Sequence, residues 1–480
     1  MSHPFNPAAN TVSPGTISPS RTVFFDLFDG EFSDCQRAQA AHFLCEQLEQ
    51  TAALPCDLPA DKAGLIAWME AGVVEVGQRY HEYLEARKAG GPRRYFRSKS
   101  HALYFLRSVA PTKLVDGAWL YGLLPRWQDP RFLSLIQTYL EELGEGLPAK
   151  NHVVLFEKLL ATQGCEKWDD LSDTHYVQGA IQLALAHNVD EFLPEVIGFN
   201  LGYEQLPLHL LITAYELKEL GIDPYYFTLH ITVDNADSGH ARKAVDAISA
   251  ATPRLGDADE FYRRVRSGYM LNHLGASTTS VIGSFDIERE MTAIFARKGA
   301  FGQYAHSDYR QVAGRTVNDW LSDPTQTADF LIAMEKEGWF KRHQDPQNSR
   351  FWKLIEGDKA RMFGVFSPYE QQVIFDWIAG EANDDGANGT KFKRLIAKPL
   401  ATDAKTPVFE APNDESGTFT TASASDFDAE VRALQENIAM ATTKEQVIET
   451  LIGLLSPAHH HSAAGLMATR IFNDMLGNAT

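Results

Sequence analysis

Apolar residues recur every three to four positions along most of the chain, from about residue 25 to 380 and again from 426 to 476. This spacing places the apolar side chains on one face of an α-helix. Residues 34–54 and 62–91 show the pattern clearly. Only 21–28 and 361–366 are rich enough in aromatic and β-branched residues to form short strands. The pattern therefore predicts an all-α fold, a helical bundle that carries additional C-terminal helices.

The composition changes sharply at one place, and this change divides the chain. Residues 397–426 are rich in Pro, Thr, Ser, Ala and Asp and read as a linker. Residues 1–22 have a similar polar character and predict a flexible N-terminal segment. Between them we expect a first helical domain over 23–270 and a helical extension or lid over 271–396. A C-terminal helical segment follows the linker and covers 427–480.

The overall composition is that of a soluble globular protein, with 44% hydrophobic and 22% charged residues among 480. The net charge of -19 argues against binding to nucleic acid or to an anionic membrane face. No apolar run reaches the roughly 18 residues of a membrane-spanning helix. The N-terminus lacks a secretion signal and the four cysteines form no CxxC pair. We therefore expect a cytoplasmic protein with reduced thiols.

Four polar residues interrupt an otherwise apolar segment near the middle of the chain: His230, Asp234, Asp237 and His240. A buried carboxylate needs a partner that compensates its charge. On a regular helix His230, Asp234 and Asp237 lie on one face, and His240 points roughly 80° away from His230. A local distortion near Gly239 would bring His240 round to the same face. Asp237 and His240 are therefore alternative third members of this group.

Helix boundaries in the surrounding sequence can be assigned from capping residues. Asp223 precedes a proline and predicts the start of the helix that carries His230. Gly144 and Gly146 predict the end of one helix, and Asn151 predicts the N-cap of the next. Pro207 predicts the end of a third helix.

Further acidic residues and a histidine share the inward faces of these helices. Glu141 continues a polar stripe, whereas Glu142 lies on the apolar side of the same helix, so Glu142 is expected to point inward. His152 opens the following helix, and Glu204 lies on a stripe with apolar residues in the third. Each residue alone could belong to a hydrogen-bonded core. Together they predict a carboxylate and imidazole site that suits iron or manganese.

Other polar residues compete for such a role. Glu216 is a weaker candidate for an inward carboxylate, and Asp116 precedes a strongly apolar run. Asp116 could equally be a helix N-terminal charge stabilised by the helix dipole. His459, His460 and His461 could bind metal, although adjacent residues on a helix point in different directions.

Three segments, "ELGEGLPAKNH", "GFNLGYEQ" and "YYFTLHITVDNADSGHA", resemble the iron-containing, haem-oxygenase-like diiron oxidases and oxygenases. The resemblance spans roughly residues 25–270 and implies a haem-oxygenase-like helical bundle. By position it implies six metal ligands and no further catalytic residue: Glu142, His152, Glu204, His230, Asp234 and His240. The family pattern has its last histidine three residues after the aspartate, where this chain has Asp237. The resemblance nevertheless favours His240, so we expect the helix to leave regular α geometry between Asp234 and His240.

The resemblance implies two Fe²⁺ ions per chain and an O2-dependent oxidase or oxygenase. Relatives act on amino acids or on fatty acids, so the fold alone does not select the substrate. We expect an amino-acid-derived or other small polar substrate in specialised metabolism, and an external electron donor. His306, Arg315 and Arg350, outside the resemblance, are candidate contacts to an anionic substrate. Two alternatives stay open: a metal-free, thiaminase-like hydrolase of the same fold that uses a cysteine, and a helical interaction protein without activity. The oligomeric state is also open, with a homodimer among the options.

Overall fold

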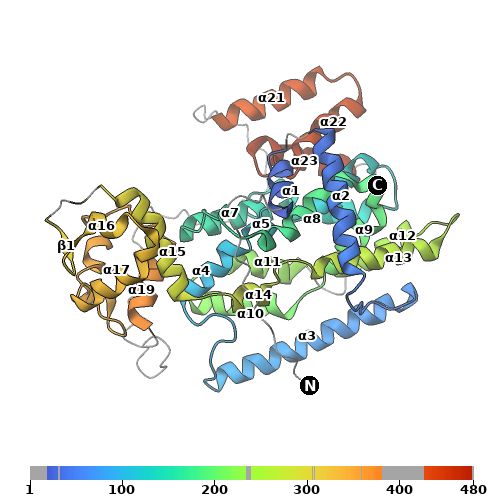
Figure 1. Ribbon diagram of the computed structural model, residues 1–480. Helices are drawn as coiled ribbons and strands as arrows, with labels where there is room; N and C mark the ends of the chain where they lie inside the picture. Colours follow the sequence, from blue (N-terminus) through green and yellow to red (C-terminus); the bar gives the residue numbers. More distant parts are fainter. Residues whose placement is uncertain are drawn as a thin grey trace, which may run out of the picture.

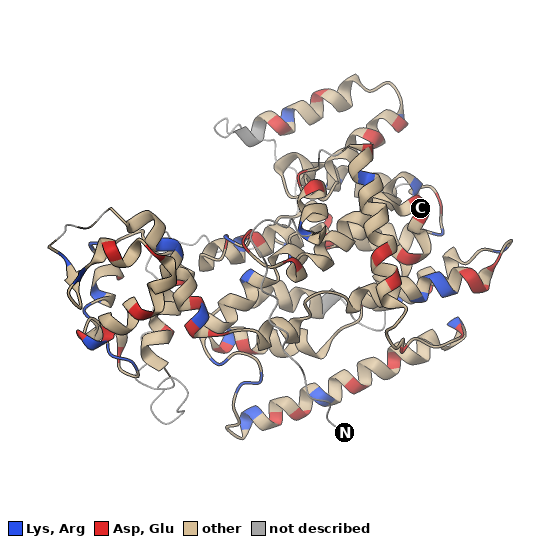
Figure 2. Ribbon diagram, in the orientation of Figure 1, with Lys and Arg blue, Asp and Glu red and all other residues tan. Residues whose placement is uncertain are grey.

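The computed structural model describes residues 19–30, 33–233, 239–304, 306, 309–357, 359–380 and 426–477. Regular structure in these ranges is helical except for one pair of two-residue strands, which confirms the predicted all-α fold (Figure 1). Figure 2 shows acidic and basic residues interspersed along the outer helix α3 (Leu65–Lys88). Within the same ranges, no helix combines the length and apolarity that crossing a membrane requires.

The central bundle contains the helices that carry Glu142, His152, His230 and His240, and Glu204 directly follows one of them. Before α3 lie α1 and α2, and after it the chain runs from α4 to α13. The bounds are α1 (Pro19–Phe28), α2 (Asp34–Thr51), α4 (Lys99–Ser108), α5 (Ala110–Lys113), α6 (Leu133–Glu142), α7 (His152–Gln163), α8 (Val177–His187), α9 (Val189–Tyr203), α10 (Leu208–Glu219), α11 (Tyr225–Val233), α12 (His240–Ala251) and α13 (Ala258–Met270). Short 3-10 turns link several of them: η1 (Lys62–Gly64), η2 (Ala118–Arg126), η3 (Gly144–Gly146), η4 (Asp173–His175) and η5 (Leu271–His273).

Two further groups of helices flank this bundle in Figure 1. The helix α14 (Thr278–Gly283) still packs on α4 of the bundle. The first flanking group, which we call the lateral lobe, covers 287–380 and includes the antiparallel strand pair β1 and β2. Its elements are α15 (Ile287–Gly302), β1 (Gln311–Val312), β2 (Arg315–Thr316), α16 (Val317–Leu321), η6 (Pro324–Gln326), α17 (Thr327–Lys336), η7 (Pro346–Asn348), α18 (Trp352–Ile355) and α19 (Pro368–Ala379). The second is the C-terminal helices, α21 (Asp426–Met440), α22 (Lys444–Leu454) and α23 (Ala463–Gly477).

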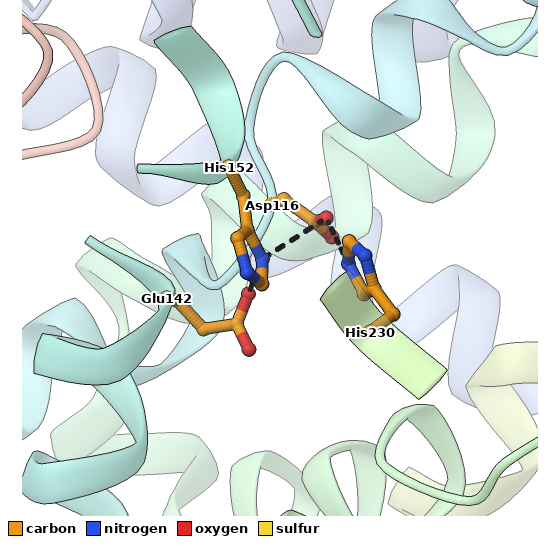
Figure 3. Close-up of side chains that lie close together, drawn as sticks. All are labelled: Asp116, Glu142, His152 and His230. Atoms are coloured by element: carbon orange, nitrogen blue, oxygen red, sulfur yellow. Dashed lines mark hydrogen bonds and ion pairs between the residues drawn. The ribbon is translucent and has the colours of Figure 1, made fainter. Parts of the chain in front are cut away.

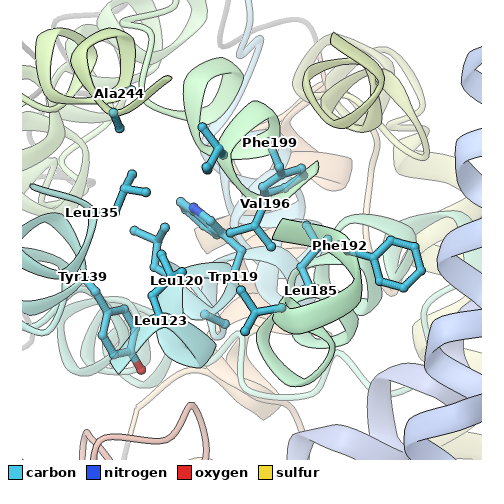
Figure 4. Close-up of a cluster of buried hydrophobic side chains, with 14 of the residues drawn as sticks. Trp119, Leu120, Leu123, Leu135, Tyr139, Leu185, Phe192, Val196, Phe199 and Ala244 are labelled. Carbon is cyan, nitrogen blue, oxygen red and sulfur yellow. The ribbon is translucent and has the colours of Figure 1, made fainter. Parts of the chain in front are cut away.

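Two large hydrophobic clusters hold these parts together. The first surrounds Trp119 and includes Phe199 of α9 and Leu135 of α6 (Figure 4), and it continues into the C-terminal helices through Leu451 and Phe472. The second joins α4, α7, α10 and α11 to the lateral lobe. The first cluster therefore crosses the predicted boundary near 427 and the second crosses the one near 270, and the division into domains stays a prediction. The predicted linker, 397–426, lies outside the described residues except for Asp426, where α21 begins.

Both strand predictions were wrong. Residues 21–28 lie within α1, and 361–366 form turns. The β-branched and aromatic residues of α1 instead pack on a helix face, where Phe24 and Leu27 are buried against α8. The preference of a residue for strands depends more on how its side chain packs against neighbours than on an intrinsic backbone preference. The contact with α8 therefore overrides it. The helix also begins at Pro19, which is inside the segment predicted to be flexible; residues 1–18 lie outside the described residues.

Buried neutral histidines give the fold a specific response to pH, and His101 of α4 is the clearest case. Its Nδ1 accepts from the Arg97 N–H at 3.3 Å and its Nε2 lies 2.8 Å from the Ile282 carbonyl oxygen. Burial lowers the pKa of His101 from 6.5 to about 4. Because the folded pKa lies below the unfolded one, the unfolded chain binds the proton more readily. Stability is therefore lost as the pH falls from 6.5 towards 4.

We predict that His101→Gln makes the free energy of unfolding less dependent on pH in this window. The glutamine Nε2 still donates to Ile282 but does not titrate, which removes up to about 1.4 kcal/mol per pH unit from the slope. Urea unfolding of the metal-free protein between pH 4 and 7 measures the slope. His42→Gln, at an exposed position, is the control. Equal slopes for the parent and His101→Gln would contradict the prediction.

Candidate metal centre

The candidate site is assembled mostly from residues at the ends of helices. Glu142 is the last residue of α6, and Glu204 is the C-cap of α9. His152 and His240 are the first residues of α7 and α12. His230 comes from within α11. All five are buried, with at most 6% of each residue exposed. Helices that begin and end at one point thus bring their polar residues into the centre of the bundle.

The first group of side chains consists of Asp116, Glu142, His152 and His230, which point towards one another in Figure 3. Each offers one ligand atom, and these atoms all lie within 4.8 Å of one another. His230 Nε2 lies 3.1 Å from Asp116 Oδ2, and His152 Nδ1 lies 3.9 Å from the same oxygen. His152 Nδ1 also contacts the Glu142 carboxylate.

The second group consists of Glu142, Glu204 and His240, within the same 4.8 Å limit. His240 Nδ1 lies 3.0 Å from Glu204 Oε2 and 3.2 Å from Glu142 Oε1. Glu142 therefore belongs to both groups, with one carboxylate oxygen directed at His152 and the other at His240. Burial alone would raise the pKa of Glu142, but His152 and His240 hold it well below its ordinary value. The shared residue is a carboxylate that faces both groups.

Asp116 is held by a network of donors on its outer side. Tyr203 donates to Oδ1 at 2.6 Å and Tyr226 donates to Oδ2 at 2.5 Å. Lys113 donates to the Tyr203 hydroxyl at 2.9 Å and lies 3.8 Å from Asp116. Burial would raise the pKa of Asp116, but Lys113 and His230 lower it, so the carboxylate is charged. Burial and Asp116 raise the pKa of both tyrosines, so both remain phenols that donate.

The helix-dipole interpretation of Asp116 is therefore wrong, because its carboxylate accepts hydrogen bonds from Tyr203 of α9 and Tyr226 of α11. Gly117 allows this placement. It has a φ of 81°, and a Cβ atom built there would lie 2.8 Å from the Glu142 Cβ. A larger residue would push Asp116 and Glu142 apart. The strongly apolar run that follows Asp116 could have indicated its burial, but its partners lie far away in the sequence.

The two histidines of α11 and α12 have defined orientations. His230 Nδ1 lies 2.8 Å from the Tyr226 carbonyl oxygen, one turn earlier, so this nitrogen carries a proton and Nε2 faces Asp116. Burial opposes a charged ring, but Asp116 raises the pKa of His230. His240 is oriented the other way, because its Nδ1 faces Glu142 and Glu204 and its Nε2 lies 2.7 Å from Glu141 Oε2.

Glu141 takes part in the site, whereas the sequence placed it on an outward polar stripe. Its carboxylate contacts His240 and also accepts from Lys243 Nζ at 2.6 and 2.7 Å. Burial would raise the pKa of Glu141, and the bonds from His240 and Lys243 lower it below the ordinary value. A carboxylate that holds one ring nitrogen of a histidine fixes which nitrogen is left for a metal. Here that nitrogen is Nδ1 of His240.

The structure brings together five of the six residues predicted as ligands: Glu142, His152, Glu204, His230 and His240. Asp234, the sixth, and Asp237 lie outside the described residues. The expected departure from regular geometry before His240 is confirmed at Gly239. There the backbone is extended, with φ -80° and ψ -169°, and α12 starts afresh. The capping predictions for Asn151 and Asp223 are also confirmed, since their side chains accept from Val154 N–H and Tyr225 N–H.

The remaining candidates lie outside both groups. Glu216 is fully buried, but it accepts from the Tyr83 hydroxyl and from backbone N–H groups of residues 94–96, so it anchors a loop. Arg315 stacks on Trp320 and Arg350 on Trp339. Both arginines, and His306, lie in the lateral lobe, and a role in substrate binding stays a prediction.

The donor set fits iron. Carboxylate oxygens and imidazole nitrogens suit Fe and Mn, whereas structural zinc prefers sulfur-rich sets. The buried carboxylates of Asp116, Glu142 and Glu204 crowd around a small volume, and buried like charges are costly unless a cation compensates them. Glu142, Glu204, His152, His230 and His240 are the described side chains that would hold the metal, with Asp116 beside them.

We predict that Glu141→Ala weakens metal binding by about 10- to 100-fold, because His240 loses the partner that fixes its Nδ1 orientation. Glu141→Gln should retain most of the affinity, since its amide oxygen still accepts from Nε2. Titration of the metal-free protein with Co²⁺ gives the affinities. Glu85→Ala removes a comparable Glu–Lys pair on exposed α3 and serves as the control. An affinity of Glu141→Ala equal to that of this control would refute the assignment.

His240→Ala is expected to reduce iron occupancy more than Asp237→Ala does. His240 is in contact with two carboxylates of the site, and its position at the start of α12 directs its ring there. Elemental analysis after anaerobic loading with Fe²⁺ provides the comparison, with circular dichroism to show that both variants keep their helices. The opposite order of the two variants would rule out His240 as the last ligand.

Comparison with known proteins agrees with this geometry. Residues 103–273 match the family model described as iron-containing redox enzyme. All six residues of the two groups lie inside this range, and so does their partner Glu141. No curated protein and no solved structure matches the chain significantly. Residues 103–273, which form the centre of the all-α, haem-oxygenase-like fold, are therefore similar to the iron-containing redox enzymes, over a segment that covers less than half of the chain.

Proposed function

We propose that the protein is an O2-dependent oxidase or oxygenase that uses two Fe²⁺ ions. The observation that carries the proposal is the position of Glu142, whose two carboxylate oxygens face two separate groups of ligands. One ion would lie among Asp116, Glu142, His152 and His230, and the other among Glu142, Glu204 and His240. A carboxylate shared in this way is typical of di-iron sites in helical bundles.

Iron bound here would supply the one-electron redox chemistry and the reactivity with O2 that protein side chains lack. The chain itself contributes orientation. Tyr226 holds His230 through its backbone carbonyl and Asp116 through its hydroxyl, so one residue positions two neighbouring groups of the site. Glu141 orients His240 through the Nε2 of its ring. These partners fix the ring orientations before a metal arrives.

The chain also buries the site away from water and places the charged Lys113 side chain close to it. The two groups are buried under the large apolar cluster around Trp119, which strengthens the electrostatic interactions of the carboxylates. Lys113 donates to Tyr203, which in turn donates to Asp116, so a cation outside the site is connected to a carboxylate within it. This row of hydrogen-bonded groups is a path along which a proton can pass towards the charged Asp116 carboxylate.

The substrate we propose is small and amino-acid-derived, in specialised metabolism, with O2 as the second substrate and an external electron donor. The resemblance of the three ligand-bearing segments to diiron oxidases and oxygenases supports O2 as the second substrate. We also place the protein in the cytoplasm, since its four cysteines are free thiols.

One alternative is a metal-free, thiaminase-like hydrolase with a cysteine nucleophile. Burial raises the pKa of Cys165 to about 12, so its thiol stays protonated and is a poor nucleophile. Cys35 and Cys45 are exposed on α2, away from both groups in sequence and on another helix. The other alternative, an interaction protein, predicts that the buried groups form a core network without metal. Metal content separates both alternatives from the proposal.

We predict that the parent protein, loaded anaerobically with Fe²⁺, retains about two iron ions per chain. Glu142→Ala should lose both, since it serves both groups, whereas Glu216→Gln, which alters a buried carboxylate outside the site, should keep them. His230→Ala should also lose iron. Colorimetric iron analysis after desalting, with circular dichroism for helical content, makes the comparison. A parent protein that retains no iron would refute the proposal.

The same ferrous protein should consume O2 faster than free Fe²⁺ when mixed with aerobic buffer and amino-acid-derived compounds. An oxygen electrode follows the reaction, and Glu142→Ala at the same total iron concentration is the matched control. Oxygen uptake by the parent no faster than by this control, across the substrate panel, would leave a metal-binding protein without oxidase activity.

A further inference from the structure

The C-terminal helices contact the candidate metal centre at one particular place, the link between the end of α6 and the start of α7. This link carries Glu142 at one end and His152 at the other. Three hydrogen bonds join it and the preceding turn of α6 to residues 455–470: Tyr139 hydroxyl to Leu455 oxygen at 2.5 Å, Asn151 Nδ2 to His460 Nδ1 at 3.1 Å, and Arg470 Nε to Gly146 oxygen at 3.0 Å.

Asn151 is the centre of these contacts. Its Oδ1 accepts from the Val154 N–H at 3.1 Å, which caps α7, and its Nδ2 donates to the Leu143 oxygen at 3.2 Å. Leu143 follows Glu142, and His152 follows Asn151. One fully buried amide therefore holds the backbone next to both of these ligand residues.

The link leaves little room for Asn151 to move. Gly144 has a φ of 64°, and a Cβ atom built there would lie 2.3 Å from the Asn151 backbone nitrogen. The backbone thus folds tightly against Asn151 on this side. On the other side its amide meets the ring of His460, which is only 2% exposed.

His460 is suited to this contact because its Nδ1 acts as the acceptor. An asparagine NH2 group donates, so His460 Nδ1 must be unprotonated and the ring neutral. Burial and the neighbouring His461 and His152 lower the pKa of His460 to about 3. The ring therefore stays an acceptor over the ordinary range of pH. His459, by contrast, is exposed, so the three histidines do not share one role.

We propose that His460 is a positioning residue of the metal centre: through Asn151 it fixes the backbone that carries Glu142 and His152. The C-terminal helices are then part of the scaffold of the site, although they follow the segment that matches the iron-containing family by more than 150 residues. The proposal rests on the proposed function in so far as Glu142 and His152 bind metal. The restraint of the link by His460 and Asn151 does not depend on metal binding.

Three variants of the full chain separate this role from simple packing. His460→Leu fills a similar volume but removes the acceptor for Asn151. His460→Asn is smaller than histidine, yet its Oδ1 takes the place of Nδ1 and keeps the acceptor. His459→Leu makes the first change at the exposed neighbour and is the control. A packing role predicts the larger defect in His460→Asn, and a positioning role predicts it in His460→Leu.

Two measurements apply to each variant. The first is amide hydrogen exchange of the metal-free protein over residues 143–155, which should be faster in His460→Leu only. The second is titration with Co²⁺, followed by its visible absorption. His460→Leu should weaken Co²⁺ binding by about tenfold or more and change the absorption bands, whereas His460→Asn and His459→Leu should remain near the parent.

The outcomes are distinguishable from those of the proposed function. Equal defects in His460→Leu and His460→Asn, or unchanged exchange over 143–155 in His460→Leu, would overturn the proposal. Faster exchange with unchanged Co²⁺ affinity and spectrum would also overturn it, since the link would then not position the ligands. A parent that binds no Co²⁺ refutes the proposed metal site itself, and the role of His460 in positioning a metal fails with it.

Discussion

The structure depends on compensating three carboxylates that are buried close together in a helical bundle. Asp116, Glu142 and Glu204 are each at most 4% exposed, and their oxygens lie within 4.8 Å of imidazole nitrogens. Removing one charge from water costs several kcal/mol unless its surroundings compensate it. Histidines compensate these charges within the two groups. Asp116 is in addition stabilised by Tyr203, Tyr226 and Lys113, which lie outside the groups. Cations of a metal centre would complete this compensation, which agrees with the match of residues 103–273 to the iron-containing redox enzymes.

Placing the site at helix ends follows from the same constraint. Two helices that pack side by side keep their backbones apart along their length. The ends of several helices, in contrast, can converge on one point. Glu142, His152, Glu204 and His240 all lie at such ends. The arrangement requires tight links, which Gly117 and Gly144 provide by adopting positive φ at positions where a side chain would collide with the neighbouring ligand segments. It also leaves the links dependent on contacts from outside.

The sequence predicted those parts of the site that depend on local geometry. Helical phase distinguishes Glu142 from Glu141, because one residue is a rotation of about 100°. Capping chemistry located the starts of α7 and α11, and Gly239 marked the interruption before His240. The contacts of Asp116 and Glu141 could not be predicted in this way, since their partners lie about 100 residues away and phase says nothing about which helices meet. The strand prediction for residues 21–28 was wrong for a related reason. The packing of this segment on α8 determines that it is the helix α1.

The parts of the chain outside the family match approach the site from two directions. The lateral lobe shares a hydrophobic cluster with Tyr226 and Phe227, the residues of α11 that precede His230. The C-terminal helices contact the link between Glu142 and His152, and His460 lies 309 residues from its partner Asn151. Each addition thus touches an element that carries ligands, and neither supplies a described member of the two groups. The two roles therefore lie in different parts of the chain. Residues 103–273 hold the donor atoms, and the lateral lobe and the C-terminal helices determine how firmly those residues are held. Variation in the additions can alter the geometry of the site while its ligands stay the same.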